Sequence, residues 1–330
     1  IAIISMWLIH KTLHIAHVPR KVYIDWAGAV LVTISVSVLL IWVSYVGKEG
    51  FYEFNSWQTY AMVGGSLVLI ALLLWIEGRV PEPVIPLRII ATRTTALAIL
   101  ASISIGVAMF GSGAFLGQYF QVAREASPTL AGVMTLPMIA GNLFGSVFSG
   151  QLISRFGRWK IFLVIGGIVN VGALGLLGMM AHDTNYWILA TGMFFNGLGM
   201  GFMLQNLVLA VQNTVKVTDI GTASSSVAFF RAVGGAAGVA VLGAMLSDKV
   251  GALVLDALKS AHLVSPDGST GVAAGGTSLN LTEMPPAVRL MYETAFGDAT
   301  GVVFMTSAIV AVVGLVCILF IKEVPLRRTV

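Results

Sequence analysis

The sequence has little charge. Of its 330 residues, 10% are Asp, Glu, Lys or Arg and 57% are hydrophobic, and the mean hydropathy is +0.91. Soluble domains carry about 25% charged residues, so that class is excluded. Apolar stretches of about 20 residues recur along the chain, which is the length that a helix needs to cross a bilayer core of roughly 30 Å. Strands of a membrane barrel would alternate apolar and polar residues, so the sequence predicts an all-α polytopic membrane protein.

Cysteine and catalytic motifs are also scarce. Cys317 is the only cysteine, which excludes an intrachain disulfide. No Walker loop occurs, so an ATP-driven pump would need its ATPase on another chain, and no nucleophile is placed with a base. The glycines of "NGLGMGF" (196–202) follow no strand and lie inside an apolar run, which favours helix packing over nucleotide binding. The sequence therefore predicts neither an enzyme nor a bound cofactor.

Three histidines near the start, His10, His14 and His17, share one face if that segment is helical. Imidazoles with this spacing can hold a metal ion. No carboxylate or cysteine completes the set, and Pro19, Arg20 and Lys21 follow at the expected membrane surface. Interfacial side chains are therefore the favoured interpretation, and no metal site is predicted.

The positive charge follows the gaps between apolar runs. The net charge of +4 is spread over short loops, which argues against a nucleic-acid surface. One set of alternate gaps holds thirteen Lys and Arg residues and the other holds five. The richer set comprises Lys11, Arg20, Lys21, Arg79, Arg88, Arg93, Arg155, Arg158, Lys160, Lys216, Lys322, Arg327 and Arg328. By the positive-inside rule this set is cytoplasmic, and so is the C-terminus.

Eight apolar runs are long enough to be membrane spans. They are 25–46, 58–77, 96–121, 129–153, 161–181, 186–211, 220–246 and 300–321. Residues 1–24 are expected to hold the end of a further span and a cytoplasmic loop, because the chain starts at Ile1 inside an apolar run, as a fragment would. Residues 247–299 are expected to form a long extracytoplasmic loop. It is either a hairpin or lid whose flanks, 248–262 and 284–297, form short amphipathic helices, or a passive solvated loop.

Polar residues inside the spans are unevenly distributed. Such side chains are costly at membrane depth and usually face protein or water. Spans 96–121, 129–153, 186–211 and 220–246 carry amides or an arginine, whereas well inside the apolar runs of the other four the only amide is Asn170. We therefore expect four helices to face a cavity and four to face lipid. The candidates for the substrate cavity are Phe115, Gln118, Asn142, Asn196, Gln205, Phe230 and Arg231.

Arg231 and Pro137 are the two least expected residues within these spans. Arg231 lies about ten residues into its run, where a role inside the protein is favoured over snorkelling to the surface. Pro137 removes a helix hydrogen bond and permits a kink, which serves either gating or a static bend.

The stretch "GQLISRFGRWK" (150–160) resembles the loop signature of the major facilitator superfamily, G-x-L-a-D-R-x-G-R-K/R. The matching residues are Gly150, Leu152, Arg155, Gly157, Arg158 and Lys160. Ser154 replaces the family's Asp, and Trp159 stands where the family often has a basic residue. Three further stretches, 81–90, 127–150 and 221–243, resemble the fourteen-helix drug:proton antiporters of the EmrB/QacA type. Gly157 is expected to permit a tight bend, and the loop is expected to take part in conformational change.

The resemblance implies a domain organisation. Residues 25–94 would hold two extra spans and a cytoplasmic linker, 95–321 the C-terminal six-helix bundle, and 322–330 a cytoplasmic tail. The family's cavity-lining helices then coincide with the four polar spans. The N-terminal half, which carries most of the family's proton-coupling acids, would be a missing partner of this chain.

The resemblance also implies a function. We expect a multi-pass protein of the plasma membrane that expels small amphipathic compounds by alternating access, driven by the proton-motive force and without a cofactor. Its partners would be these substrates, the lipid bilayer and the missing half, and not nucleic acid. The alternatives are a carrier of a lipid, peptide or metabolite with the same fold, and a scaffold or remnant that does not transport.

Overall fold

The computed structural model describes residues 6, 11–12, 25–46, 55–80, 87–261 and 286–325, and these residues form helices without any strand. Eight segments of this part are long and apolar enough to cross a membrane. The helices are α2 (Trp26–Tyr45), α3 (Trp57–Glu77), α4 (Leu87–Ile90), α5 (Arg93–Val122), α6 (Pro128–Met134), α7 (Leu136–Phe156), α8 (Lys160–Gly178), α9 (Tyr186–Gln212), the 3-10 turn η1 (Val217–Asp219), α10 (Ile220–Ser260) and α11 (Pro286–Phe320). The expected all-α membrane fold is therefore confirmed.

Several helices start at a polar side chain that accepts a hydrogen bond from the first turn. Asp25 accepts from Gly28 N at 2.8 Å at the start of α2, and Ser56 accepts from Thr59 N at 3.3 Å at the start of α3. Asn185 does the same for α9, accepting from Trp187 N at 2.9 Å. Such caps satisfy backbone donors that have no partner inside the helix. They mark the points where the apolar runs begin.

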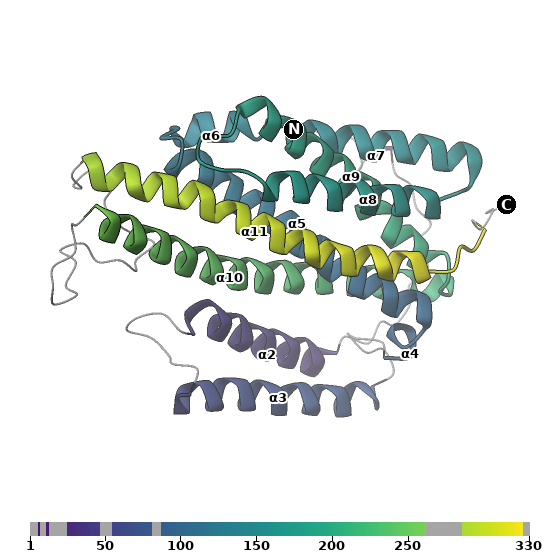
Figure 1. Cartoon of the computed structure of the whole chain (residues 1–330). Coiled ribbons are helices and arrows are strands. Elements are labelled where there is room, and N and C mark those ends of the chain that lie inside the picture. Colours follow the sequence, from purple (N-terminus) through teal and green to yellow (C-terminus); the bar gives the residue numbers. More distant parts are fainter. Residues whose placement is uncertain are drawn as a thin grey trace.

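The helices run side by side along one axis (Figure 1). Helix α7 packs mainly against α9, and α5 packs against α10, α11 and, less extensively, α9. Helix α8 lies between α9 and α11. Helices α2 and α3 form a hairpin that packs on this six-span bundle chiefly through α2 against α10. The fold is thus a bundle of six spans with an added pair.

Glycines bring several pairs of helices into backbone contact, most closely α7 with α9 and α5 with α10. A Cβ on Gly197 of α9 would overlap the carbonyl oxygen of Met138 in α7, and one on Gly141 of α7 would overlap that of Phe194 in α9. In the same way, a Cβ on Gly106 of α5 would overlap the carbonyl oxygen of Arg231 in α10. Only glycine fits where backbones approach so closely. The packing role expected for the glycines of 196–202 is confirmed.

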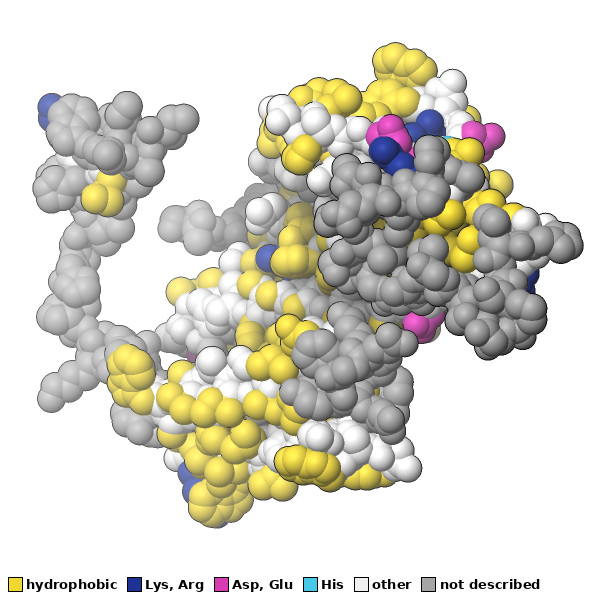
Figure 2. Space-filling model, turned by 90° about the vertical axis from the view of Figure 1, so that its left-hand side faces the viewer, with side chains coloured by type: hydrophobic (Ala, Val, Ile, Leu, Met, Phe, Trp, Pro, Cys, Tyr) yellow, Lys and Arg dark blue, Asp and Glu magenta, His cyan; other side chains and the backbone are white. Residues whose placement is uncertain are grey.

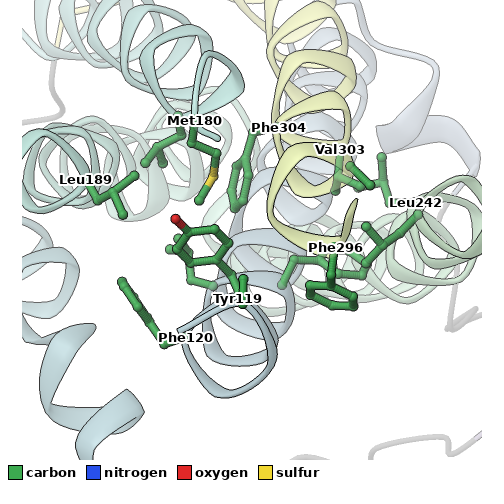
Figure 3. Close-up of a cluster of buried hydrophobic side chains, with 14 of the residues drawn as sticks. Tyr119, Phe120, Met180, Leu189, Leu242, Phe296, Val303 and Phe304 are labelled. Carbon is green, nitrogen blue, oxygen red and sulfur yellow. The ribbon is translucent and has the colours of Figure 1, made fainter. Parts of the chain in front are cut away.

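The largest core cluster lies between α5, α8, α9, α10 and α11. Figure 3 shows Tyr119, Met180 and Phe304 turned toward one another, with Val303 and Leu242 meeting on the other side of α11. Tyr119 is fully buried, and its hydroxyl donates to the carbonyl oxygen of Ala181 at 2.9 Å. A buried tyrosine usually finds such a partner. This bond ties the end of α5 to the turn after α8.

The segment expected to be a long loop is largely helical where the structure describes it. Helix α10 continues without a break to Ser260, and α11 begins at Pro286. The sequence predicted that the first of these spans would end at 246 and that the second would begin at 300. Val250, Val254 and Leu258, spaced by four residues, form a buried stripe in the same cluster as Val288 and Phe296 of α11. The expected flanking helices are therefore extensions of the spans, because their apolar faces continue the core.

The basic residues divide between the two ends of the bundle. The turns after α3, α7 and α9 and the segment after α11 lie at one end, and the turns after α5 and α8 at the other (Figure 1). The described cations of the first end are Arg79, Arg88, Arg93, Arg155, Arg158, Lys160, Lys216 and Lys322. Figure 2, viewed onto the opposite end, shows basic and acidic side chains next to one another. There Arg289 binds Glu125 at 2.5 Å and Glu293 at 2.8 Å.

Candidate functional site

The most enclosed of the candidate cavity residues is Asn196 in α9. It is fully buried, and its Nδ2 donates to Ser112 Oγ of α5 at 2.9 Å, while its Oδ1 has no hydrogen-bond partner. An amide that is buried and half satisfied retains one acceptor for another donor. This bond joins α5 to α9, and among the described residues it is the one hydrogen bond between two of the four polar spans that involves a candidate side chain.

The Asn196–Ser112 bond is expected to contribute modestly to stability. In a double-mutant cycle on the purified full-length protein, Asn196→Ala and Ser112→Ala should show a coupling of about 1 kcal/mol, because hydrogen bonds between membrane helices are worth about that much. The midpoint of thermal unfolding of the two single variants and the double variant provides the measurement. Strictly additive losses would contradict the bond.

The other amide candidates lie nearer the surface of the described chain. Gln118 of α5 and Gln205 of α9 are exposed, and Asn142 of α7 is half-buried. The backbone of Asn142 passes beside Gly197, 2.9 Å from the position of a Cβ there. Phe115 departs from this pattern, because it is only 2% exposed and belongs to the core cluster. Exposed amides on a membrane helix need another polar surface or water to cover them.

Arg231 and Phe230 are both half-buried in α10. Within the described chain, the guanidinium of Arg231 makes no hydrogen bond and no ion pair, while its backbone carbonyl packs against Gly106 of α5. This contact fixes the backbone of Arg231, while the guanidinium leaves its five donors available to groups beyond the described residues. A cation placed in this way suits an electron-rich or anionic group of a ligand.

The span that contains Pro137 is divided into two helices. Helix α6 ends at Met134, Thr135 adopts a φ of −88° and a ψ of −2°, and α7 begins at Leu136 with Pro137 in its first turn. Proline is tolerated at this position because its missing N–H would have no partner there. The interruption precedes the proline by two residues, and whether it serves gating stays a prediction.

The turn between α7 and α8 holds the loop motif. Gly157 ends α7 with a φ of 72°, in the left-handed region that glycine adopts at no steric cost, so the bend expected there is present. The guanidinium of Arg155 stands 5.6 Å from the centre of the Phe156 ring. Lys160 Nζ donates to the carbonyl oxygen of Leu319 at 3.0 Å, near the end of α11. Ser154 Oγ donates to Gly150 O at 2.6 Å, within its own helix. Of the motif's cations, Lys160 is thus the one bonded to the end of another helix.

Some buried polar groups were not predicted from the sequence. Asn170, on a span expected to face lipid, is 1% exposed and lines a small cavity with Ser104 and Met203, between α5, α8, α9 and α11. None of the seven candidate residues lines this cavity. Within the described residues no group of His, Cys, Asp and Glu could hold a metal ion, and the three histidines considered above lie outside them.

Comparison with known proteins gives a family match. The family described as Major Facilitator Superfamily matches residues 9–239. An uncharacterized MFS-type transporter of Mycobacterium tuberculosis is 32% identical over 308 residues, which cover 93% of this chain and 44% of that protein. The multidrug transporter protein MdtP of Bacillus subtilis is 28% identical, with 99% of this chain and 64% of that protein covered.

Other matches extend this result. The MFS-type efflux pump LUC4 of a Fusarium species is 25% identical over 92% of this chain and 54% of the pump. A solved structure of a bacterial homologue of the human lysosomal transporter Spinster, inward-facing and occupied, has a TM-score of 0.51 and 18% identity, covering 88% of this chain and 62% of that one. This likeness concerns the fold alone. The chain spans about half the length of the curated relatives that it matches.

Proposed function

The chain belongs to the major facilitator superfamily, and from that premise we propose that it is the C-terminal portion of a fourteen-helix exporter of amphipathic compounds. The observation that carries the proposal is the similarity to proteins named as multidrug transporter or efflux pump over more than nine-tenths of this chain. The described architecture supports it, because α2 and α3 form the added pair and the other six spans form one bundle.

The four polar spans, α5, α7, α9 and α10, support a transport path along one side of this bundle. They pack as two pairs, α7 with α9 and α5 with α10, and each pair is fixed by glycine contacts. We propose that Gln118, Asn142, Gln205, Phe230 and Arg231 face the substrate, while Phe115 and Asn196 support them from within. In this family, substrate sites lie near the membrane midplane between two halves that rock against one another.

The energy source and the orientation belong to the same proposal. The proton-motive force would drive export, and the acids that take up the proton would lie largely in the other half of the transporter. The end of the bundle that holds the α7–α8 turn would be cytoplasmic, together with the C-terminus, because it carries most of the basic residues of the short loops. The loop motif, with Gly150, Arg155, Gly157, Arg158 and Lys160, would move with the helices as the halves rock.

Dye efflux tests the proposed function. Cells that lack their own major pumps and express the full-length protein should accumulate several-fold less of an amphipathic dye that carries an anionic or electron-rich group than cells with an empty vector, and an uncoupler should abolish the difference. Dye accumulation measured by fluorescence is the readout. Uptake of a specific lipid, peptide or metabolite without dye efflux would favour the other carriers of this fold, and absence of any transport would favour the scaffold.

A further inference from the structure

The segment that follows α11 lies against the turn between α7 and α8. Residues 321–325, which we name the C-terminal strap, leave α11 at the same end of the bundle as that turn and the end of α9 (Figure 1). Ile321 is fully buried, whereas residues 322–325 are exposed. The strap therefore lies on the outside of this end, over side chains that come from other helices.

Two side chains from distant parts of the chain bind the strap through its backbone. Trp159 Nε1 donates to Val324 O at 2.9 Å, and Asn213 Nδ2 donates to Val324 O at 3.0 Å and to Pro325 O at 2.8 Å. Trp159 is fully buried and Asn213 is 7% exposed. A buried indole N–H without a partner is costly, so the strap carbonyls satisfy donors that have little access to water.

Glu323 adds a charge at the same place. The backbone N–H of Lys160, at the start of α8, donates to Glu323 Oε1 at 3.3 Å, and the residue before it, Trp159, provides no side-chain cap. A carboxylate is favourable at the N-terminus of a helix. Ser154 stands where the loop signature has an acid and bonds only within α7. The carboxylate at this turn therefore comes from the strap.

We propose that the C-terminal strap is a brace that makes the ends of α8, α9 and α11 move as one unit, with Trp159, Asn213 and Glu323 as its positioning residues. Three observations support it independently: the indole bond from the α7–α8 turn, the two amide bonds from the end of α9, and the carboxylate at the start of α8. In addition, Lys160 Nζ donates to Leu319 O and so joins the start of α8 directly to the end of α11.

Hydrogen exchange of the purified full-length protein tests the brace without any transport. Trp159→Phe keeps the ring and removes the donor, and Asn213→Leu removes the two amide bonds. Each should raise exchange about tenfold in peptides that cover residues 157–163 and 209–216, and leave α2 and α3 unchanged. Val324→Ala, which keeps the carbonyl, is the matched control and should exchange as the wild type does. If both peptides exchange as slowly in Trp159→Phe and in Asn213→Leu as they do in the wild type, the proposal is overturned.

A transport arm rests on the proposed function and separates a positioning role from loss of the fold. In Trp159→Phe and Asn213→Leu, the maximal rate of dye efflux per folded molecule should fall several-fold with an unchanged KM, because the strap lies at the end of the bundle and away from the substrate. A raised KM with an unchanged maximal rate would overturn this role. If the wild type moves no dye, the proposed function fails, while the exchange result still decides whether the brace exists.

Discussion

Replacing Gly197 with alanine is expected to lower the stability of the protein by about 3 kcal/mol, at the upper end of the usual cost of overpacking. An alanine Cβ would overlap the carbonyl oxygen of Met138 and lie 2.9 Å from the amide nitrogen of Asn142, both in α7. These are backbone atoms, so no side-chain rotation relieves the contact and α7 and α9 must separate. The midpoint of thermal unfolding of the purified full-length protein, and its yield after extraction from the membrane, measure the effect.

Gly172→Ala provides the matched control. Gly172 lies in α8, and a Cβ there would meet nothing within 4 Å. Because alanine is the better helix former, this variant should be as stable as the wild type or slightly more so. Equal unfolding midpoints for Gly197→Ala and Gly172→Ala would show that α7 and α9 are not in backbone contact.

Replacing Arg231 with alanine is expected to lower the initial rate of dye efflux by about tenfold, which corresponds to about 1.4 kcal/mol. The guanidinium is half-buried in α10 and makes no ion pair with the described residues, while the backbone of the same residue is fixed against Gly106. A cation at such a place is costly unless a ligand or another part of the transporter uses it. The rate is measured in cells and normalised to the amount of protein in the membrane.

Two further variants serve as controls for the effect of Arg231→Ala. Arg231→Lys keeps the charge without the planar fork and should retain part of the activity. Lys216→Ala removes an exposed cation at the end of the bundle and should leave efflux unchanged. Full activity in Arg231→Ala would remove this residue from the substrate path, and equal losses in Arg231→Ala and Lys216→Ala would indicate an effect of net charge alone.

The spans were predictable from the sequence because crossing a bilayer requires about 20 apolar residues, and each expected run corresponds to a span in the structure. A short amphipathic helix over 248–262 was expected, but its unbroken continuation of the span before it was not. The polar residues 247–249 interrupt the apolar run, and beyond them the buried side chains lie on one face, as the spacing of Val250, Val254 and Leu258 shows. The regular spacing of apolar residues in this segment, and the similar spacing in the segment before Val303, is the sequence signal from which the longer helices could have been predicted.

The candidate site was only partly predictable. Amides within apolar runs indicated α5, α7 and α9, and Arg231 indicated α10, but nothing in the sequence showed that Asn196 meets Ser112, because serine is frequent in membrane helices. The strap was missed for a similar reason: Trp159 and Val324 are far apart in sequence, and the bond goes to a backbone carbonyl, which every residue offers. Contacts of this kind leave no pattern in the side chains of one partner.

The hairpin of α2 and α3 has a consequence for the orientation of the helices that follow it. It crosses twice, so the chain returns to the end from which it departed, and α5 begins there (Figure 1). Its contact with the six-span bundle is made chiefly by α2 against α10. Inserting an even number of spans at the edge of a bundle leaves every later loop on the same side of the membrane. A single added span would move all later loops to the other side, where their basic residues would violate the positive-inside rule. Two spans are therefore the smallest insertion that leaves the orientation of the following helices unchanged.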